Sequence, residues 1–412
     1  VFGVLMTTRR NLLKGCMQGA LVGLSAPRLS LAESATQHNL IWVTCFGGWD
    51  PTRTLVPAFD SPLVNLEPIV EPMEFGGLKL VDHPGRPSVR EFFQQYSDIA
   101  TVLHGVLTPS VAHEACLQLI RTGMPAGQAD WPTILASELF AHYPIPHMVL
   151  SGHAFPGDIG HMVARTGSGE QLKALLNGTL AEFSDVFVSS TTQRLRTAES
   201  QMRQRRLSQL IEQSNQDPMA LLMLEQFEAN ALSADVLRSK ESALTWNEEG
   251  SFFGDCLTAV DLLREGVTPC ISIEHPALWD SHSSNDVYQH WLWEELFAGL
   301  LTLCNELKAT STPSGNLLNN TTIVVASDMG RAPRLNSSQG KDHWPYSSLL
   351  VLSNQMEGQR SIGAYDDGFQ GVSLSSGFGL NSDQQLTAAH FGHAMLDLWG
   401  VSHPSNPVVY PI

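Results

Sequence analysis

Short runs of apolar, often β-branched residues recur along the chain and end at polar or glycine-containing segments. The run at residues 40–46 stops at Gly47-Gly48, and the run at 322–326 stops at Ser327-Asp328. Runs of this length and composition are typical of strands that are buried on both faces of a sheet. The same pattern predicts four further strands, at residues 99–103, 147–150, 270–273 and 348–352.

Between these runs, apolar residues recur at intervals of three or four, which predicts helices with one buried face. Strands that alternate with helices indicate an α/β fold, in which a mainly parallel central sheet is covered by helices on both sides. The prediction is therefore a three-layer α/β sandwich. Its helices are predicted at residues 88–96, 114–122, 132–140, 254–265, 288–310 and 384–399.

Residues 189–246 differ from the segments on either side of them. They contain no glycine, are rich in Arg, Gln, Glu, Leu and Ala, and show helical periodicity over most of their length. We predict a helical insertion or cap, broken near Asp217-Pro218 because proline interrupts a helix. A coiled-coil arm that joins two copies of the chain is less favoured, since no heptad pattern persists for three repeats.

The N-terminus has the composition of an export signal. Residues 8–14 (TRRNLLK) resemble the twin-arginine consensus, a weakly apolar stretch follows at 15–26, and Ser30-Leu31-Ala32 places small residues where a signal peptidase cleaves. We therefore predict a twin-arginine signal peptide at residues 1–32, the twin-arginine export machinery as a partner, and a mature domain at 37–412. The protein is then periplasmic or secreted, without a stable membrane span after cleavage, because the apolar stretch is short and rich in glycine.

The charge of the chain narrows the range of partners. The formal net charge is -17, and residues 1–32 carry four cations and no acid, so the mature chain has 20 basic against 41 acidic residues, or -21. Such a charge argues against nucleic acid and anionic membrane surfaces as partners. An anionic substrate must then be attracted locally, by metal ions or by a few arginines.

Acidic and imidazole side chains follow several of the predicted strands. Because ligands bind at the carboxyl ends of strands in open α/β sheets, these residues are candidates for a shared site. The four segments are Gly47-Gly48-Trp49-Asp50, Trp279-Asp280-Ser281-His282, Ser327-Asp328-Met329-Gly330-Arg331 and Lys341-Asp342-His343-Trp344.

Each candidate also has an ordinary structural interpretation. Asp50 precedes a proline in a glycine-rich turn, where an aspartate often caps a turn or helix. The segment with Asp280 and His282 is also consistent with a solvated loop, and Arg331 with an ion pair that braces its own loop. Asp328 is harder to explain in this way, because a carboxylate directly after a buried strand is costly unless it is paired or bound to a metal.

Taken together and in this order, the four segments resemble the domain-of-unknown-function 1501 family, over about residues 40–400. Members of that family are exported bacterial proteins with an alkaline-phosphatase/sulfatase-like fold. The resemblance implies an alkaline-phosphatase-like domain with one or two divalent metal ions, of the type Zn, Mg, Mn or Ca, that bind the phosphate or sulfate group.

Carried across by motif, Asp280, His282 and His343 are expected to hold one metal ion, and Asp50 with Asp328 the second. In the wider superfamily a histidine ligand often follows the strand-end aspartate, whereas this chain has Met329. The second site is then lined mainly by oxygen, which favours Mg, Mn or Ca over Zn, or it is empty.

The nucleophile is the weakest match to the superfamily. The helix that ends in Thr122-Gly123 has the register of the sulfatase nucleophile helix, and this register places His113 at the nucleophile position. Ser110 or Thr108 serves if the alignment slips, and His113 is then a metal ligand or a general base. No sulfatase-type modification motif is present in the sequence. Arg331, and less clearly Lys341, is expected to bind the anionic oxygens of the substrate.

The leading hypothesis is an exported, metal-dependent hydrolase of phosphate or sulfate esters. Its substrate would be a small anionic ester or a decorated polysaccharide. The alternative is a non-catalytic metal- or ligand-binding relative that acts in envelope or extracellular assembly, and a mutase or transferase on the same scaffold is a third possibility. Function depends on the site rather than on the fold, so the arrangement of the site residues is needed to choose among these three functions.

Overall fold

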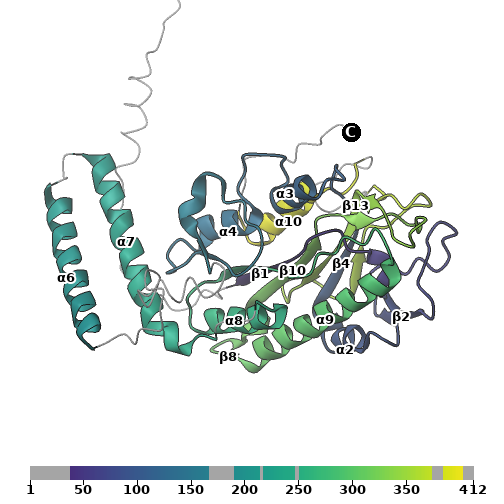
Figure 1. Cartoon of the computed structure of the whole chain (residues 1–412), viewed down its shortest axis with the longest axis horizontal. Helices are drawn as coiled ribbons and strands as arrows, with labels where there is room; N and C mark the ends of the chain where they lie inside the picture. The colour runs from purple at the N-terminus through teal and green to yellow at the C-terminus, as the bar shows by residue number, and fades with distance from the viewer. Residues whose placement is uncertain (1–37, 167–189, 214–216, 246–249, 374–383, 402–412) are drawn as a thin grey trace, which may run out of the picture. The chain divides into compact units, whose positions relative to one another are not determined.

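The computed structural model describes residues 38–166, 190–213, 217–245, 250–373 and 384–401 (Figure 1). The predicted signal peptide at 1–32 lies outside these ranges. In the part of the chain that is described, no helix is long and apolar enough to cross a membrane.

An eight-stranded sheet forms the centre of the molecule, with the strand order β14-β4-β13-β10-β1-β7-β5-β6. Strand β13 runs antiparallel to both of its neighbours, while the other pairs in this sheet are parallel. The sheet is therefore mixed but mainly parallel. Its strands are β1 (Asn39–Cys45), β4 (Ala100–Leu107), β5 (His147–Val149), β6 (Val163–Arg165), β7 (Cys270–Glu274), β10 (Thr321–Ser327), β13 (Tyr346–Leu352) and β14 (Arg360–Ile362).

The burial of β1 and β10 explains why these two strands lie in the middle of the sheet. All seven residues of β1 and all seven of β10 are buried, and the two strands pair in register from Asn39–Thr321 to Cys45–Ser327. Alternate side chains of β1 enter different cores: Ile41 and Val43 pack on one face of the sheet, and Trp42 packs on the other. A strand that is buried at every position and mostly apolar suits a sheet that is covered on both sides.

Helices cover both faces of the sheet, which makes the architecture three-layered (Figure 1). On the face of Ile41, the core includes residues of α2 (Pro87–Tyr96), α8 (Phe252–Arg264) and α9 (Asn285–Ala309). On the face of Trp42, it includes residues of α3 (His113–Thr122), α4 (Trp131–Leu139) and α10 (Ala388–Leu398).

Two long helices, α6 (Ser190–Gln213) and α7 (Pro218–Lys240), occupy most of the segment predicted to be a helical insertion. The second of them begins at Pro218, where the sequence predicts the break. The remaining short elements are η1 (Pro51–Arg53), β2 (Glu71–Phe75), β3 (Leu78–Asp82), η2 (Ser97–Ile99), η3 (Gly157–Met162), η4 (Glu241–Ala243), β8 (Ser311–Thr312), β9 (Gly315–Asn316), η5 (Leu317–Asn320), β11 (Gly330–Arg331) and β12 (His343–Trp344).

All six predicted strands are present in the central sheet, and the predicted helices agree with α2, α3, α4, α8 and α9 within a few residues. The start of the last helix is a correction: it begins at Ala388 rather than at residue 384. Thr387 caps it, because its side chain accepts a hydrogen bond from the backbone N–H of His390 and the imidazole of His390 returns to the Thr387 backbone. This capping box fixes the first turn of the helix at that residue.

The topology brings several distant segments to one edge of the sheet. Strands β1, β4, β7 and β10 run in the same direction, so the chain leaves all four at their carboxyl ends on that edge. The antiparallel strand β13 begins there, directly after β12. The loops that follow β1, β4, β7 and β10, and the segment that leads into β13, carry the residues of the site.

Candidate metal centre

The turn after β1 holds the carboxylate of Asp328. The backbone N–H groups of Gly47 and Gly48 both donate to Asp328 Oδ1, at 2.9 and 2.8 Å. Gly47 has φ +111°, and a Cβ atom there would lie 2.6 Å from the backbone nitrogen of Trp279, so only glycine fits this close approach. Asp328 is fully buried, and these bonds replace the water that it loses.

The other oxygen of Asp328 orients His113. Asp328 Oδ2 lies 2.7 Å from Nδ1 of His113, the first residue of α3. This hydrogen bond is the main reason why the pKa of His113 is raised above its ordinary value. Because a carboxylate only accepts hydrogen bonds, Nδ1 carries the proton and Nε2 of the neutral ring has a free lone pair. Nε2 is buried, has no hydrogen-bond partner among the residues that the structure describes, and lies 3.6 Å from Asp280 Oδ2.

Two further imidazoles are oriented in the same way. Nδ1 of His343 lies 2.7 Å from the backbone carbonyl of Val111, and Nδ1 of His282 lies 3.2 Å from Asp342 Oδ1. Both partners are acceptors, so each Nδ1 donates and each Nε2 offers a lone pair. The two Nε2 atoms are only 2.9 Å apart. Two lone pairs at this distance repel each other unless a proton or a metal ion lies between them.

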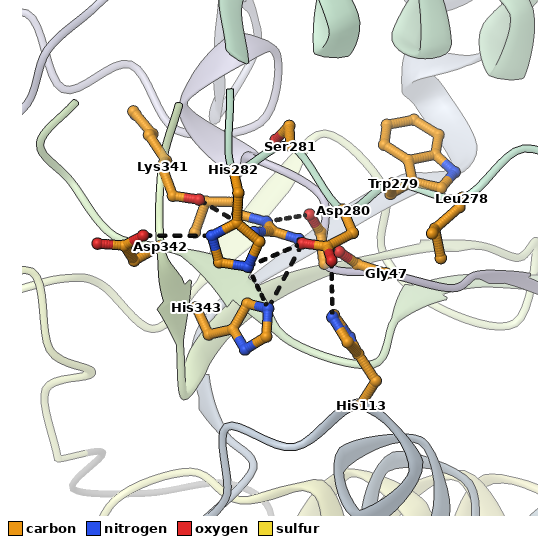
Figure 2. Close-up of polar contacts among 12 residues, drawn as sticks. Gly47, His113, Leu278, Trp279, Asp280, Ser281, His282, Lys341, Asp342 and His343 are labelled. Carbon is orange, nitrogen blue, oxygen red and sulfur yellow. Dashed lines mark hydrogen bonds and ion pairs between the residues drawn. The ribbon is translucent and has the colours of Figure 1, made fainter. Parts of the chain in front are cut away.

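Asp280 completes the cluster. Its Oδ1 lies 3.2 Å from His282 Nε2 and 3.4 Å from His343 Nε2 (Figure 2). Burial acts to raise the pKa of this carboxyl, but the hydrogen bond and the positive charge of Arg331 outweigh it, so that the pKa lies below its usual value. Figure 2 shows the side chains of His113, Asp280, His282 and His343 pointing toward one another.

This donor set fits a divalent ion. Ligand atoms that surround a tetrahedral zinc at about 2 Å lie roughly 3.3 Å from one another, and the three distances among Asp280 Oδ1, His282 Nε2 and His343 Nε2 run from 2.9 to 3.4 Å. Ligand atoms of His113, Asp280 and His343 also all lie within 4.8 Å of one another. His113 Nε2, which has no hydrogen-bond partner among the described residues, is therefore a further candidate ligand atom for an ion at this cluster.

Arg331 braces the site and has little capacity left for a substrate. Its guanidinium is fully buried and donates to the backbone carbonyls of Gly47, Gly48 and Lys341 as well as to Asp280 Oδ1 at 2.6 Å. These four bonds join three loops. Of the two interpretations of Arg331, anion binding and loop bracing, the contacts favour the second.

Asp50 lies in a different network. Its carboxylate is fully buried and forms ion pairs with Lys341, at 2.8 Å, and with Arg53, at 3.3 Å. It also accepts hydrogen bonds from Thr52 and Asn285. Burial acts to raise the pKa of Asp50, but the charges of Lys341 and Arg53 outweigh it and hold the pKa far below its usual value.

Asp50 and Asp328, the two predicted ligands of the second metal ion, thus share no contact partner in the described structure. Each carboxylate has its own protein partners, and neither belongs to a group of three close ligands among the described residues. Met329, at the position where the superfamily often has a histidine, is fully buried. The second metal site, predicted from the family resemblance, has no support in these contacts.

Ser110 lies at the side of the cluster rather than within it. Its Oγ accepts a hydrogen bond from the backbone N–H of Ala112, at 3.1 Å, and the residue lines a neighbouring cavity. Thr108 donates its hydroxyl to the carbonyl of Pro345. Neither hydroxyl is oriented by an imidazole in these contacts.

A second group with ligand chemistry, Glu67, His83 and His290, was not expected from the sequence. Here Arg86 already supplies the positive charge, because its fully buried guanidinium forms an ion pair with Glu67 and lies 3.3 Å from His290 Nδ1. His83 follows the short strand β3, which was not predicted from the sequence, and His290 lies in α9, so the sequence patterns did not pair them.

Sequence reasoning also missed the groups that orient the ligands. The roles of the Val111 carbonyl, of Asp342 and of Asp328 Oδ2 depend on loops that meet only in the folded chain. For His113, the sequence left the roles of nucleophile, ligand and base open. The geometry places its free ring nitrogen beside Asp280, among the ligands.

The fold and the cluster together define an α/β protein with a candidate metal centre at the carboxyl edge of its sheet. Residues 171–374 match a family described as "Protein of unknown function (DUF1501)", which supports the resemblance found in the sequence. A comparison with curated proteins found no match.

Two solved structures are distantly similar to this chain. The C-terminal periplasmic domain of EcEptC from Escherichia coli, in complex with Zn, is 10% identical, with 90% of this chain and 85% of that chain covered and a TM-score of 0.35. The PH0037 protein from Pyrococcus horikoshii is also 10% identical, with 90% and 99% covered and a TM-score of 0.35. Values this low carry no argument about function.

Proposed function

We propose that this protein is an exported, metal-dependent hydrolase of phosphate or sulfate esters. One divalent ion would be held by Asp280, His282 and His343, with His113 as a further ligand. A divalent ion at such a place supplies Lewis-acid stabilisation of anionic oxygens and lowers the pKa of water toward neutrality. Export and the alkaline-phosphatase-like character of the domain are parts of the same proposal.

The convergence of ring nitrogens is the observation that carries the proposal. Each of the three histidines has Nδ1 committed to an acceptor, so that all three Nε2 lone pairs are left for the cluster. A protein that needed these histidines only for packing would have no reason to turn three lone pairs and a carboxylate toward one point. Metal ligation is the arrangement in which histidines are held in this way by carboxylates and carbonyls.

The donor chemistry favours zinc among the candidate ions. Imidazole nitrogen suits Zn and other transition metals, whereas Mg and Ca prefer oxygen ligands. Three imidazoles with a single carboxylate are therefore a poor set for Mg or Ca. The expectation of an oxygen-lined second site applied to Asp50 and Asp328, whose carboxylates are already held by protein groups.

The other residues would position the ligands. Asp328 keeps His113 in the tautomer that leaves Nε2 free, and Arg331 holds Asp280 against the turn at Gly47. The ion, rather than Arg331 or Lys341, would attract the anionic group, because both cations are buried and committed to protein acceptors. Water is the nucleophile in this proposal, because Ser110 lies at the side of the cluster and the three imidazoles contact other groups.

The number of ligands favours a second candidate, a non-catalytic metal- or ligand-binding relative in envelope or extracellular assembly. Structural zinc sites are closed by four protein ligands, whereas catalytic sites keep one position open. If His113, Asp280, His282 and His343 all bind together, the site is closed. If the half-exposed His282 leaves the ion, three ligands remain and one position is open.

The experiment that separates these functions combines metal analysis with turnover. Bound metal is measured by mass spectrometry on the purified protein and on His343→Ala, with His161→Ala, an exposed histidine, as the matched control. Hydrolysis of aryl phosphate and aryl sulfate is assayed before and after chelation. We expect about one zinc per chain in the wild type and in His161→Ala, a loss of metal in His343→Ala, and turnover that chelation removes.

Two outcomes would contradict the hydrolase. Protein that holds stoichiometric zinc but shows no turnover of either ester that is sensitive to chelation would favour the binding relative. Protein without metal, or a His343→Ala variant with unchanged metal content, would mean that the ligand assignment is wrong.

A further inference from the structure

A cavity of about 760 Å³ opens beside the metal cluster. Two residues connect it with the cluster: the carbonyl of Val111 holds His343 Nδ1, and Trp344 directly follows His343 in the chain. The volume lies within the range of small-molecule sites, about 300 to 1,000 Å³. The cavity is lined by Leu107, Pro109, Ser110, Val111, Leu119, Pro125, Trp344, Pro345, Tyr346 and Gln370.

The walls of this cavity are apolar and partly aromatic. Among the described residues that line it, none is charged, and only Ser110 and Gln370 are polar without an aromatic ring. The polar ends of the two aromatic residues are held by protein groups: Trp344 Nε1 donates to the carbonyl of Phe369 at 2.7 Å, and Tyr346 Oη to Gln385 Oε1 at 3.1 Å. The rings therefore offer carbon surface to the cavity rather than hydrogen bonds.

Val111 is the wall residue that connects the cavity most directly with the metal cluster. Its side chain is 52% exposed, although its own carbonyl holds a ligand of the metal centre. A large exposed aliphatic side chain at this place would be covered when a ligand fills the cavity, which would remove its apolar surface from water.

We propose that this cavity binds the aromatic group of an ester whose anionic end lies at the metal centre; this rests on the proposed function. Aromatic rings pack well against the faces of Trp and Tyr and against apolar side chains. A sugar ring is a poorer fit, because its hydroxyl groups would lose water and find only Ser110 and Gln370 as polar partners among the described residues of the wall. The substrate class is therefore an aryl phosphate or aryl sulfate rather than a decorated polysaccharide.

The test uses ligands that cannot be hydrolysed. Affinities of the metal-loaded protein for naphthylmethylphosphonate and methylphosphonate, which share the anionic group and differ in the apolar one, are compared by calorimetry. The uncharged 2-naphthol is titrated separately, with and without metal. Val111→Asn makes the wall polar without adding charge, and Val287→Asn, at a valine that is 76% exposed in α9, is the matched control.

We expect the naphthyl ligand to bind on the order of fiftyfold more tightly than the methyl ligand, since a buried ring removes on the order of a hundred Å² of apolar surface from water. Val111→Asn should reduce this preference about threefold, and Val287→Asn should leave it unchanged. 2-Naphthol should bind with or without metal and should bind more weakly to Val111→Asn.

The two proposals fail in different ways. Equal affinity for both phosphonates together with no binding of 2-naphthol would overturn the aromatic site while leaving the metal centre intact. Binding of 2-naphthol that depends on Val111, in protein that takes up no added metal and binds neither phosphonate, would support the cavity as an aromatic site and overturn the hydrolase. A preference that Val287→Asn alters as much as Val111→Asn would also overturn the assignment to this cavity.

Discussion

Two groups of charged side chains lie at the same edge of the sheet and differ in one respect. Around Asp50, every charge has a protein partner: Lys341 and Arg53 face its carboxylate, and Thr52 and Asn285 donate to it. Around Asp280, three imidazole nitrogens converge with the carboxylate, and no proton donor of the protein is placed between His282 Nε2 and His343 Nε2 in these contacts. We call the first the closed network and the second the open cluster.

The difference teaches how a ligand can be told from a structural ion pair. Both groups combine an acid with residues from the same loops, and Lys341 and His343 are only two positions apart. Residue type and position in the sequence do not separate them. What separates them is whether the donors and acceptors of each group are satisfied within the chain, because a buried lone pair without a partner is costly.

The largest effect should come from breaking the closed network. Lys341→Met leaves Asp50 buried with one cation fewer, so we expect the free energy of unfolding in denaturant to fall by about 3–5 kcal/mol. Metal content per folded molecule should stay the same, because Lys341 is not a ligand. Lys79→Met is the control. Lys79 Nζ lies 3.9 Å from Glu74 Oε1, both side chains are exposed, and exposed pairs contribute about 0–1 kcal/mol. Equal losses in the two variants would contradict the closed network.

His147 resembles the closed network in that both of its ring nitrogens have protein partners, and the pH dependence of stability tests this. Thr133 Oγ1 lies 3.0 Å from Nδ1, and Ser272 Oγ lies 2.9 Å from Nε2. Burial lowers the pKa of His147 to about 4 in the folded protein, against about 6.5 in the unfolded chain. Between pH 6.5 and 4 the unfolded state binds more protons, so the stability that the neutral ring contributes is complete above pH 6.5 and is lost as the pH falls to 4.

The wild type should therefore lose roughly 3 kcal/mol more stability than His147→Gln between pH 7 and pH 4. Unfolding in urea over a series of pH values measures this difference. His161→Gln, at an exposed histidine, should follow the wild type. Parallel curves for the wild type and His147→Gln would show that the ring is not held neutral.

Asp328→Asn tests the orientation of His113 in the open cluster. The new amide can still accept from Gly47 and Gly48, but its NH₂ group then faces His113 Nδ1. The His113 imidazole would then adopt the tautomer with its proton on Nε2, so that Nε2 no longer has a lone pair for the metal ion. We expect the affinity for zinc to fall on the order of tenfold to thirtyfold, within the range for groups that orient ligands. An unchanged affinity, measured by competition with a chelator, would exclude His113 from the site.

Asp342→Asn should give the smallest effect. Asp342 is 66% exposed and orients His282 from the solvent side, so water can replace part of its contact. We expect a decrease of about threefold in zinc affinity, below the effect of Asp328→Asn. A larger loss in Asp342→Asn than in Asp328→Asn would mean that His282, rather than His113, is the ligand on which the ion depends.

The sequence predicted the layers of the fold because burial on two faces is visible in composition. The runs at 40–46 and 322–326 are apolar at nearly every position, and they form adjacent central strands. The position of the site followed from the same runs, since polar residues after parallel strands meet at one edge. The capping of α10 at Thr387 was missed because the apolar periodicity continues across the start of the helix.

The roles of individual side chains could not be predicted to the same extent. Asp50 and Asp328 both lie in the segments that follow neighbouring strands, and only the folded chain places a lysine against one and a histidine against the other. Those partners are separated from the two carboxylates by 291 and 215 positions, respectively. Pairing over such distances depends on the direction of loops, which hydrophobic periodicity does not describe.

The spread of the open cluster along the chain has a consequence for biogenesis. Its candidate ligands come from residue 113, from residues 280 and 282, and from residue 343, so a nascent chain that ends before residue 343 lacks part of the set. An ion that binds only the completed arrangement adds its binding free energy to the native state and none to partly made chains. Zinc supply during synthesis would then stabilise only chains in which all three segments have been made, and metal starvation would leave the folded protein less stable.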